Sequence, residues 1–416
     1  MKQKPNVGIV SLGCPRNLVD SENILGRLNL KGYPIVDIDR ADIAVVNTCG
    51  FIQDAKKESI EVILDLIELK KERKIRKIIV YGCLSQRYKD VLAKELPEVD
   101  AFVGKISLNH NSHLQLTPHH FAYLKIAEGC VSDCSFCVIP TIKGKFTSLP
   151  VDSVVRQAVS LDAKGVRELN IIGQDITGYG IDLYGTSSLD TLVEKIAGAV
   201  KNVRWLRLLY LSPHHLSDAL LDLIKSEQRI CKYIDLPLQH INSRILKLMN
   251  RKTTKQEILK LIEKIRKIIP QVGIRTSLIV GFPSETEKEF DELLRFVKAA
   301  QFERLGVFMY SREEGTKAYS YKDQVGQKIK AQRFNAVMAL QQEVSRQVNK
   351  KFLGNVLEVL IDEKENGCFV GRSQYDAPEV DGVVYVHAEE DLLPGDFVRV
   401  KITDTLEYDL IGEPVR

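Results

Sequence analysis

No apolar run in this sequence approaches the roughly 18 residues that a membrane-spanning helix needs. Its start, MKQKPNVGIVSLG, lacks the apolar core of a secretory signal peptide. A chain of 416 residues can bury a large core and needs no disulfide staples, so its eight cysteines are expected to stay reduced. We therefore predict a soluble cytoplasmic protein with no membrane partner.

The chain also has little net charge. Its formal net charge is only +4, which by itself favours no class of partner. The distribution is nevertheless uneven. Residues 353–416 hold five Lys/Arg against fifteen Asp/Glu, a local balance of −10, which leaves +14 on residues 1–352. A basic body followed by an acidic tail predicts different partners for the two ends.

The pattern of apolar runs divides the chain into three parts. Residues 4–118 alternate short apolar runs with helical patterns, which predicts an N-terminal parallel α/β domain that ends in a polar linker at 106–120. Residues 119–347 contain six βα-like units, typical of a partial (β/α)6 barrel, and their last segment is a basic helical connector. Residues 349–416 carry several short strand patterns and predict a small all-β barrel.

Cys130, Cys134 and Cys137 form a CxxxCxxC motif in AEGCVSDCSFCVIP, directly after the first predicted strand of the second part. Three thiolates on one short loop can hold three irons of a [4Fe–4S] cluster and leave the fourth iron open to a ligand. A structural zinc site is the alternative, but zinc normally takes four protein ligands, and no fourth Cys or His lies at finger spacing. The motif therefore favours a cluster with an open iron, at which chemistry can occur.

Cys14, Cys49 and Cys83 lie far apart in the sequence, but each follows an apolar strand pattern of the first part: GIVSLGC, IAVVNTC and KIIVYGC. The carboxyl ends of parallel strands line one edge of a sheet, so these cysteines are expected to converge there. An isolated buried cysteine is often only a small apolar residue, but three at equivalent strand ends favour a second cluster site. Cys231 and Cys368 have no such context and are predicted to be structural.

Polar residues also follow two predicted strands of the central barrel. Gly173, Gln174 and Asp175 end one strand, and Gln239 and His240 end another, which suits a polar ligand across the barrel mouth. The same residues could instead form satisfied loop pairs. Farther on, VGFPSETEKEF predicts a helix capped by Ser284 with Glu287 in the capping-box position.

The CxxxCxxC motif after a barrel strand resembles radical S-adenosylmethionine (SAM) enzymes, in which the open iron binds SAM. The upstream cysteines narrow the resemblance to the methylthiotransferases, which carry a second three-cysteine cluster and a C-terminal TRAM domain. On this resemblance, Cys130, Cys134 and Cys137 hold the radical SAM [4Fe–4S] cluster, and Cys14, Cys49 and Cys83 hold an auxiliary [4Fe–4S] cluster. The five polar strand-end residues are then expected to form the SAM pocket.

Within that family, SLGCPRNLVDSE, YIDLPLQHINSRILKLMNR and GRSQYDAPEVDG resemble the RimO branch, whereas tRNA-modifying MiaB-like members typically show a YGCQMN-type first motif. Two departures stand out. The family's arginine-rich IPSFRG…RSR stretch reads IPTIKGKFTSLP here, with Lys143, Ser148 and Leu149 at arginine-bearing positions, and Ser212 stands where relatives often show tyrosine. Both cysteine motifs are intact.

The resemblance implies β-methylthiolation of an aspartate of small-subunit ribosomal protein S-twelve, free or in the subunit, with two SAM molecules consumed per product. An electron donor and a sulfur donor are then further partners. The acidic tail suits a basic protein better than a nucleic acid. A tRNA methylthiotransferase and a ribosome-associated iron–sulfur electron carrier are the alternatives. An electron carrier would explain the cysteines but not the six βα-like units.

Overall fold

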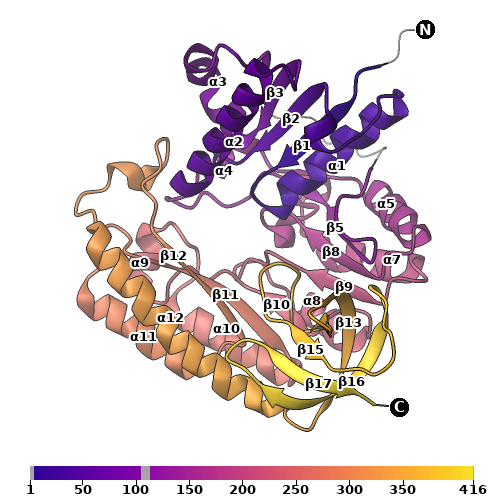
Figure 1. The fold of residues 1–416 in the computed structure, drawn as a ribbon. Coiled ribbons are helices and arrows are strands. Elements are labelled where there is room, and N and C mark those ends of the chain that lie inside the picture. Colours follow the sequence, from indigo (N-terminus) through magenta and orange to yellow (C-terminus); the bar gives the residue numbers. More distant parts are fainter. Residues whose placement is uncertain (1–3, 105–112, 416) are drawn as a thin grey trace.

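The computed structural model describes residues 4–104 and 113–415. Residues 1–3, residues 105–112, which include the first part of the predicted linker, and Arg416 lie outside the described residues. Figure 1 shows the N-terminal α/β domain at the top, the central domain below it, and the small C-terminal β-barrel packed against the lower part of the central domain. Within the described ranges, no helix is both long and apolar enough to cross a membrane.

The N-terminal domain is a four-stranded parallel sheet in the order β1-β2-β3-β4. Alternate residues of its strands serve two cores: Ala44 and Val46 pack with α2 and α3, whereas Val45 packs on the side of α1. All carboxyl ends point toward the barrel (Figure 1). The elements are β1 (Val7–Ser11), α1 (Pro15–Leu30), η1 (Ile38–Arg40), β2 (Ile43–Thr48), α2 (Gln53–Lys71), β3 (Lys77–Gly82), α3 (Cys83–Glu95) and β4 (Ala101–Val103).

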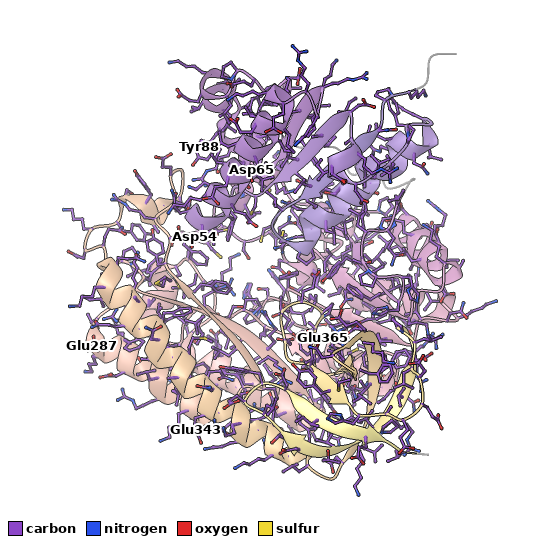
Figure 2. The ribbon with its side chains drawn as sticks, in the orientation of Figure 1. Asp54, Asp65, Tyr88, Glu287, Glu343 and Glu365 are labelled. Carbon is purple, nitrogen blue, oxygen red and sulfur yellow. The ribbon has the colours of Figure 1, made fainter. Side chains whose placement is uncertain are left out.

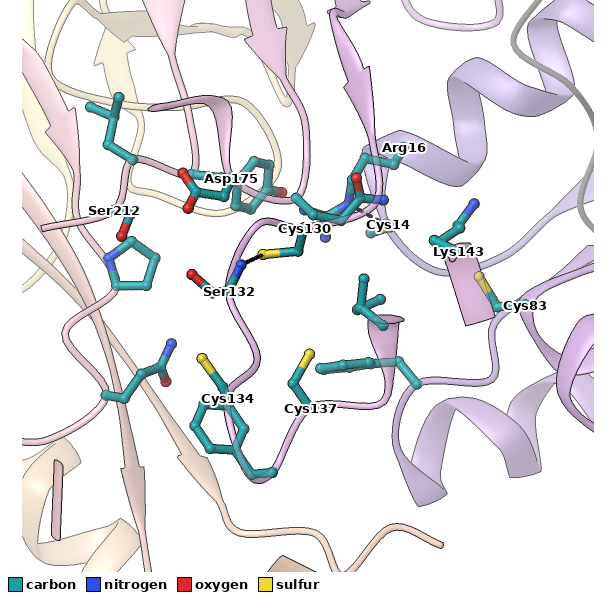
Figure 3. A pocket seen from close by; sticks show the side chains of 18 of the residues that line it. Cys14, Arg16, Cys83, Cys130, Ser132, Cys134, Cys137, Lys143, Asp175 and Ser212 are labelled. Carbon is teal, nitrogen blue, oxygen red and sulfur yellow. Dashed lines mark hydrogen bonds between the residues drawn. The ribbon is translucent and has the colours of Figure 1, made fainter. Parts of the chain in front are cut away.

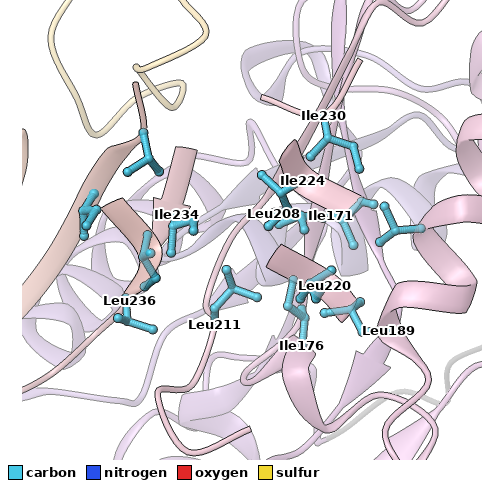
Figure 4. Packing of buried hydrophobic residues seen from close by; sticks show 14 of the residues in the cluster. Ile171, Ile176, Leu189, Leu208, Leu211, Leu220, Ile224, Ile230, Ile234 and Leu236 are labelled. Carbon is cyan, nitrogen blue, oxygen red and sulfur yellow. The ribbon is translucent and has the colours of Figure 1, made fainter. Parts of the chain in front are cut away.

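The central domain has the six expected βα-like units, but its barrel strands form two parallel sheets, β5-β8-β9 and β10-β11-β12. Backbone hydrogen bonds from Cys231 N to Leu206 O and from Leu211 N to Asp235 O, each 3.0 Å, join the two sheets. The sequence pattern did not indicate this break. The apolar residues in Figure 4 form part of the core of this domain.

The elements of the central domain follow in chain order. They are β5 (Phe121–Lys125), β6 (Ala127–Glu128), α4 (Ile139–Lys143), β7 (Thr147–Ser148), α5 (Val151–Ala163), β8 (Glu168–Ile172), η2 (Ile176–Gly178), α6 (Ile181–Tyr184), α7 (Leu189–Ala199), β9 (Trp205–Leu208), α8 (Asp218–Ser226), β10 (Tyr233–Asp235), α9 (Ser243–Leu248), α10 (Lys255–Ile268), β11 (Gly273–Val280), α11 (Glu287–Ala300), β12 (Arg304–Met309), η3 (Lys317–Ser320) and α12 (Gln327–Asn349).

The predicted cap of α11 was wrong by two residues. Thr286, not Ser284, caps the helix, and Glu289, not Glu287, completes the capping box. Ser284 has a positive φ of 62° and accepts a hydrogen bond from Arg244, so it belongs to the preceding turn. The sequence offers S-x-x-E at one position and T-x-x-E two residues later, and the turn selects the second.

The C-terminal part is a closed five-stranded barrel in the order β13-β14-β15-β17-β16. Its elements are η4 (Lys350–Phe352), β13 (Val356–Glu365), β14 (Cys368–Ser373), β15 (Val384–Val386), β16 (Phe397–Thr405) and β17 (Leu410–Pro414). The closing strand β17 has no clear alternating pattern and was missed in the sequence.

The loop 374–383 between β14 and β15 ties this barrel to the inner wall of the central domain. Asp376 accepts a 2.9 Å hydrogen bond from Arg304 Nε, and Asp381 pairs with Arg275 at 3.2 Å. Tyr123 of β5 donates to Glu379 at 2.8 Å. The small barrel and the central domain therefore share a charged, largely buried interface.

Candidate functional site

One cavity of about 280 Å³ lies where the N-terminal domain meets the carboxyl ends of the barrel strands. All six cysteines of the two sequence motifs line it. In Figure 3, Cys134 and Cys137 point upward into the same space that Cys130 enters from above, and Cys83 enters from the side of the N-terminal domain. The two cysteine sets, which belong to different domains, thus share one chamber.

The loop of Cys130, Cys134 and Cys137 follows β6 and is held by its neighbours. The backbone N–H of Ser132 donates to Cys130 Sγ at 3.4 Å, and Arg251 Nη1 donates to Cys134 Sγ at 3.5 Å. Burial raises the pKa of the Cys130 thiol to about 11 and that of Cys137 to about 12. These thiols stay protonated at neutral pH until a metal displaces the proton.

The second set sits at the sheet edge, where two of its cysteines begin helices. Cys14 is the N-cap residue of α1, and Cys83 is the first residue of α3. Helix N-termini favour negative charge, so they suit thiolate ligands and an anionic cluster. Cys49 directly follows the end of β2 between these two helix starts.

A glycine beside each of these cysteines lets the three loops touch. A Cβ on Gly13 would lie 2.8 Å from the Cβ of Cys49, and one on Gly50 would lie 2.9 Å from the carbonyl carbon of Cys83. Gly82 has a φ of +103°, and its Cβ would lie 2.4 Å from Asn47 Oδ1. Larger residues at these positions would push the cysteine loops apart.

The three thiols of this set differ in their electrostatics. Burial raises the pKa of Cys83 to about 12, although the nearby Lys143 cation opposes this shift, and burial also raises the pKa of Cys49. Burial alone would raise the pKa of Cys14 too. There, the charge and hydrogen bond of Arg16, with backbone N–H groups, outweigh burial and lower the pKa.

Arg16 connects the two domains at the cavity and was not singled out from the sequence. Its Nε donates to Cys14 Sγ at 3.4 Å, and its Nη1 donates to the carbonyl oxygen of Gly173 at 2.9 Å. The guanidinium also lies 4.3 Å from the centre of the Tyr210 ring. The arginine in LGCPRN, two residues after a cluster cysteine, was the available signal.

The predicted SAM pocket is only partly at the cavity. Gln174, Asp175 and Gln239 line it, and Gln174 Oε1 and Asp175 Oδ2 are buried without a hydrogen-bond partner. Gly173 does not line the cavity and contributes only its carbonyl to Arg16. His240 does not line the cavity and is fully buried: its Nδ1 accepts from Asn242 N at 3.0 Å, and its Nε2 lies 4.0 Å from Glu285 Oε1.

A buried charge network forms the wall between Cys83 and Gln174. Lys125 and Lys143 both pair with Glu128, at 2.8 and 3.1 Å, and both also contact Asp20. Burial would raise the pKa of Glu128, but the two lysines lower it instead. Gln174 Nε2 donates to Glu128 at 3.1 Å, which orients the Gln174 amide.

The positions that depart from the family's arginine pattern have other roles. Lys143 lines the cavity as part of this charged wall. The Ser148 hydroxyl donates to Asp182 at 2.6 Å, and Leu149 packs in the main core. Ser148 and Leu149 therefore do not line the chamber, whereas Ser212 does.

The donor set fits iron–sulfur clusters better than single ions. All eight cysteines are free thiols. Among the residues that the structure describes, no three Cys, His, Asp or Glu side chains lie close enough together to hold one metal ion. Each set offers three sulfurs around open space, and the cavity lining adds no histidine, which matches a cubane held by three cysteines with one iron open.

Comparison with family models divides the chain into the same three parts. Residues 6–104 match the "Uncharacterized protein family UPF0004", residues 124–297 match the radical SAM superfamily, and residues 353–415 match the TRAM domain. The fold also resembles a radical SAM methyltransferase, TsrM from Kitasatospora setae, with a TM-score of 0.55 at 12% identity over 88% of this chain and 80% of that one.

Curated relatives match over nearly the full length. The chain is 47% identical to the "Ribosomal protein uS12 methylthiotransferase RimO" of Thermoanaerobacter sp. (strain X514), covering 98% of this chain and 99% of the relative. It is also 47% identical to the protein of the same name from Geobacter sulfurreducens, over 99% and 98%, and 43% identical to that from Clostridioides difficile, over 98% of each.

Proposed function

Because this chain belongs to the RimO family of radical SAM methylthiotransferases, we propose that it attaches a methylthio group to ribosomal protein uS12 at the cavity between its first two domains. The observation that carries the proposal is the convergence of six cysteines from two domains on one chamber of about 280 Å³. A reaction that needs two clusters facing one substrate atom requires such an arrangement.

Radical SAM enzymes use a [4Fe–4S] cluster and SAM, and we assign Cys130, Cys134 and Cys137 to this cluster. We assign Cys14, Cys49 and Cys83 to a second cluster, which the match to the N-terminal family permits. When bound, these groups supply what protein side chains cannot: a reducing electron, a carbon-centred radical and an activated sulfur. The aspartate β-carbon that the family resemblance implies as target would lie between the two sets.

The remaining lining residues have roles that follow from their chemistry. Gln174 and Asp175 present unpartnered buried oxygens to the chamber, which suits the amino and ribose groups of SAM. Arg16 and Arg251 direct cationic donors at Cys14 and Cys134 and would stabilise negative charge on the ligand sulfurs.

Five apolar residues, Phe51, Phe136, Ile139, Leu211 and Pro237, form apolar walls of the chamber. Apolar walls keep solvent away from reacting groups, which limits side reactions of reactive intermediates. The burial that raises the thiol pKa values reports the same low-dielectric surroundings.

The proposal is tested by anaerobic reconstitution with iron and sulfide, followed by incubation with SAM, a reductant and either uS12, small ribosomal subunits or tRNA. Mass spectrometry should find a methylthio gain on uS12, free or in the subunit. Gain on tRNA alone would refute the substrate assignment.

Iron content tests the assignment of the ligands. The intact chain should bind about eight irons, and Cys83→Ala should retain about four. Cys368→Ala is the matched control, because this thiol lies on β14 of the C-terminal barrel, away from the cavity. If Cys83→Ala and Cys368→Ala bound equal amounts of iron, the second cluster site would be wrong.

A further inference from the structure

We propose that Glu313 is a positioning residue that locks the N-terminal domain onto the central domain and so fixes the spacing between the two cysteine sets. It lies in the segment 311–320 after β12, outside the cavity lining. This inference rests on the proposed function, since it concerns how the two sets cooperate.

The carboxylate of Glu313 joins two cations of the N-terminal domain. Its Oε2 accepts from Lys56 Nζ of α2 and from Arg87 Nη1 of α3, each at 2.8 Å, while its Oε1 accepts from Ser311 Oγ at 2.7 Å. The side chain of Glu313 is only 3% exposed and that of Arg87 only 5%. Burial would raise the pKa of Glu313, but the hydrogen bonds from Lys56, Ser311 and Arg87 lower it, so the group is charged at neutral pH.

Arg87 carries this contact directly to the cysteine loops. It lies one helical turn after Cys83 in α3, and its Nη1 also donates to the carbonyl oxygen of Gly50 at 3.0 Å. Gly50 follows Cys49 in the chain. Tyr88, labelled in Figure 2, packs beside both cations, with its ring centre 5.0 Å from the Arg87 guanidinium and 5.7 Å from Lys56 Nζ.

The same segment touches the other cysteine set. Thr316 Oγ1 donates to the carbonyl of Glu313 at 2.7 Å, and Ala318 N donates to the carbonyl of Ser135 at 2.8 Å. Ser135 lies between Cys134 and Cys137. Residues 313–318 therefore form a strut from the CxxxCxxC loop to the loops of Cys49 and Cys83.

The placement of the strut explains why one residue matters. On the β5 side, the domains are joined by Asp20 with Lys125 and Lys143, and by Arg16 with Gly173. Within residues 4–104 and 113–415, every ion pair between the N-terminal domain and the chain beyond β12 ends on Glu313. Without this carboxylate, Lys56 and Arg87 would repel each other. Resistance to hinging about the β5 side would then fall to the hydrogen bond from Arg87 Nη2 to the carbonyl oxygen of Glu314 and to the apolar contacts of Phe51 and Cys83 with Val138 and Ile142.

Loss of the lock should separate the two parts of the reaction. Cleavage of SAM needs only the central domain and its cysteine set, whereas transfer of the sulfur needs both sets at their correct spacing. A displacement of about 1 Å can cost on the order of 100-fold in a positioned reaction. We expect 5′-deoxyadenosine to form while methylthiolated product falls.

The test compares Glu313→Gln with Glu314→Gln. The second is the matched control, because it is the same change at the next residue, whose side chain is exposed. Glu313→Gln should raise the ratio of 5′-deoxyadenosine to product by about 10-fold or more, at an unchanged content of about eight irons. Glu314→Gln should match the parent chain.

Hydrogen exchange of the cluster-free chain gives a readout that is independent of activity. Glu313→Gln should speed exchange in residues 83–90 and 311–320, and the paired variant Lys56→Met with Arg87→Met, which leaves the buried Glu313 carboxylate without its cations, should do the same. Unchanged exchange, an unchanged ratio, or a changed ratio accompanied by loss of iron would overturn the proposal. A parent chain that makes no product would refute the proposed function instead, and the exchange result would still decide on the lock.

Discussion

Replacement of Asp376 by alanine should loosen the C-terminal barrel from the central domain. Asp376 lies in the loop 374–383 and is 1% exposed, and its partner Arg304 on β12 is 6% exposed. The guanidinium donates to Asp376 through both Nε and Nη2. In the variant, Arg304 would keep only the carbonyl of Glu303 and the side-chain oxygen of Asn349, at 2.9 and 3.4 Å.

The size of the effect follows from the buried charge that loses its partner. Removal of one member of a buried pair costs about 3–5 kcal/mol. The hydroxyl of Ser373, which donates to Asp376 at 2.6 Å, loses its acceptor and adds about 1 kcal/mol. At about 2–4 °C per kcal/mol for a domain of this size, the Tm of the cluster-free chain should fall by about 10–20 °C.

The paired variant Arg304→Met with Asp376→Ala identifies the cause. Because no unpaired charge remains, it should recover most of the lost stability, as happens when apolar residues replace a whole buried pair. Thermal unfolding followed by circular dichroism measures all three variants. A single variant that costs less than about 1 kcal/mol, or a paired variant no more stable than the single one, would refute the reasoning.

Three further outcomes are expected. Gly82→Ala should lower bound iron from about eight to about four, because its Cβ would meet Asn47 and Thr48, whereas Gly185→Ala, also at positive φ but with open space around it, should keep both clusters. Arg16→Met should weaken iron binding at Cys14 and raise the pKa of that thiol, measurable by thiol alkylation against pH, and an unchanged alkylation profile would contradict the role given to its guanidinium. For Glu289, burial is outweighed by hydrogen bonds from Arg244 and Thr286, which lower its pKa to about 2, so its stabilisation is complete above about pH 4.5 and is lost as the pH falls toward 2. Glu289→Gln should therefore remove about 1–3 kcal/mol of the pH-dependent free energy of unfolding in that window, and an unchanged pH dependence would show that the pair contributes nothing.

The convergence of the distant cysteines could be predicted because, in a parallel sheet, a residue that directly follows a strand lies at the carboxyl edge of the sheet. An apolar run followed by cysteine puts that cysteine at the carboxyl edge, and three such runs in a sheet ordered β1-β2-β3-β4 put Cys14, Cys49 and Cys83 at the same edge. The three cysteines of CxxxCxxC lie on one short loop, so their proximity could be predicted without the strand order. Neither argument depended on the details of packing.

What the sequence did not reveal depends on contacts between segments far apart in the chain. Arg16 meets the carbonyl of Gly173 and Glu313 meets Arg87 only after the domains are docked, and no periodicity encodes either pair. His240 is the opposite case: it belongs to the same polar strand end as Gln239, but the chain turns at Gln239, with φ of +73°, and the next side chain is buried in the core.

The acidic tail requires the largest change of interpretation. Its balance of −10 suggested a surface for a basic partner, yet four of its fifteen acids pair with arginines of the body: Glu358 with Arg204, Asp376 with Arg304, Asp381 with Arg275 and Glu407 with Arg346. Part of the negative charge of the tail is therefore neutralised by arginines of the body, and these pairs hold the tail to the body.

The acids left for a partner are those that stay exposed and outside these pairs. They include Glu363 and Glu365 at the end of β13 and Glu389 and Glu390 on the loop after β15, and other exposed acids include Glu379, Asp396, Asp404 and Glu413. For the ribosomal-protein substrate proposed above, charge complementarity would act through this smaller patch. Salt should slow association through the patch, while the buried pairs that hold the tail to the body should be far less sensitive to it.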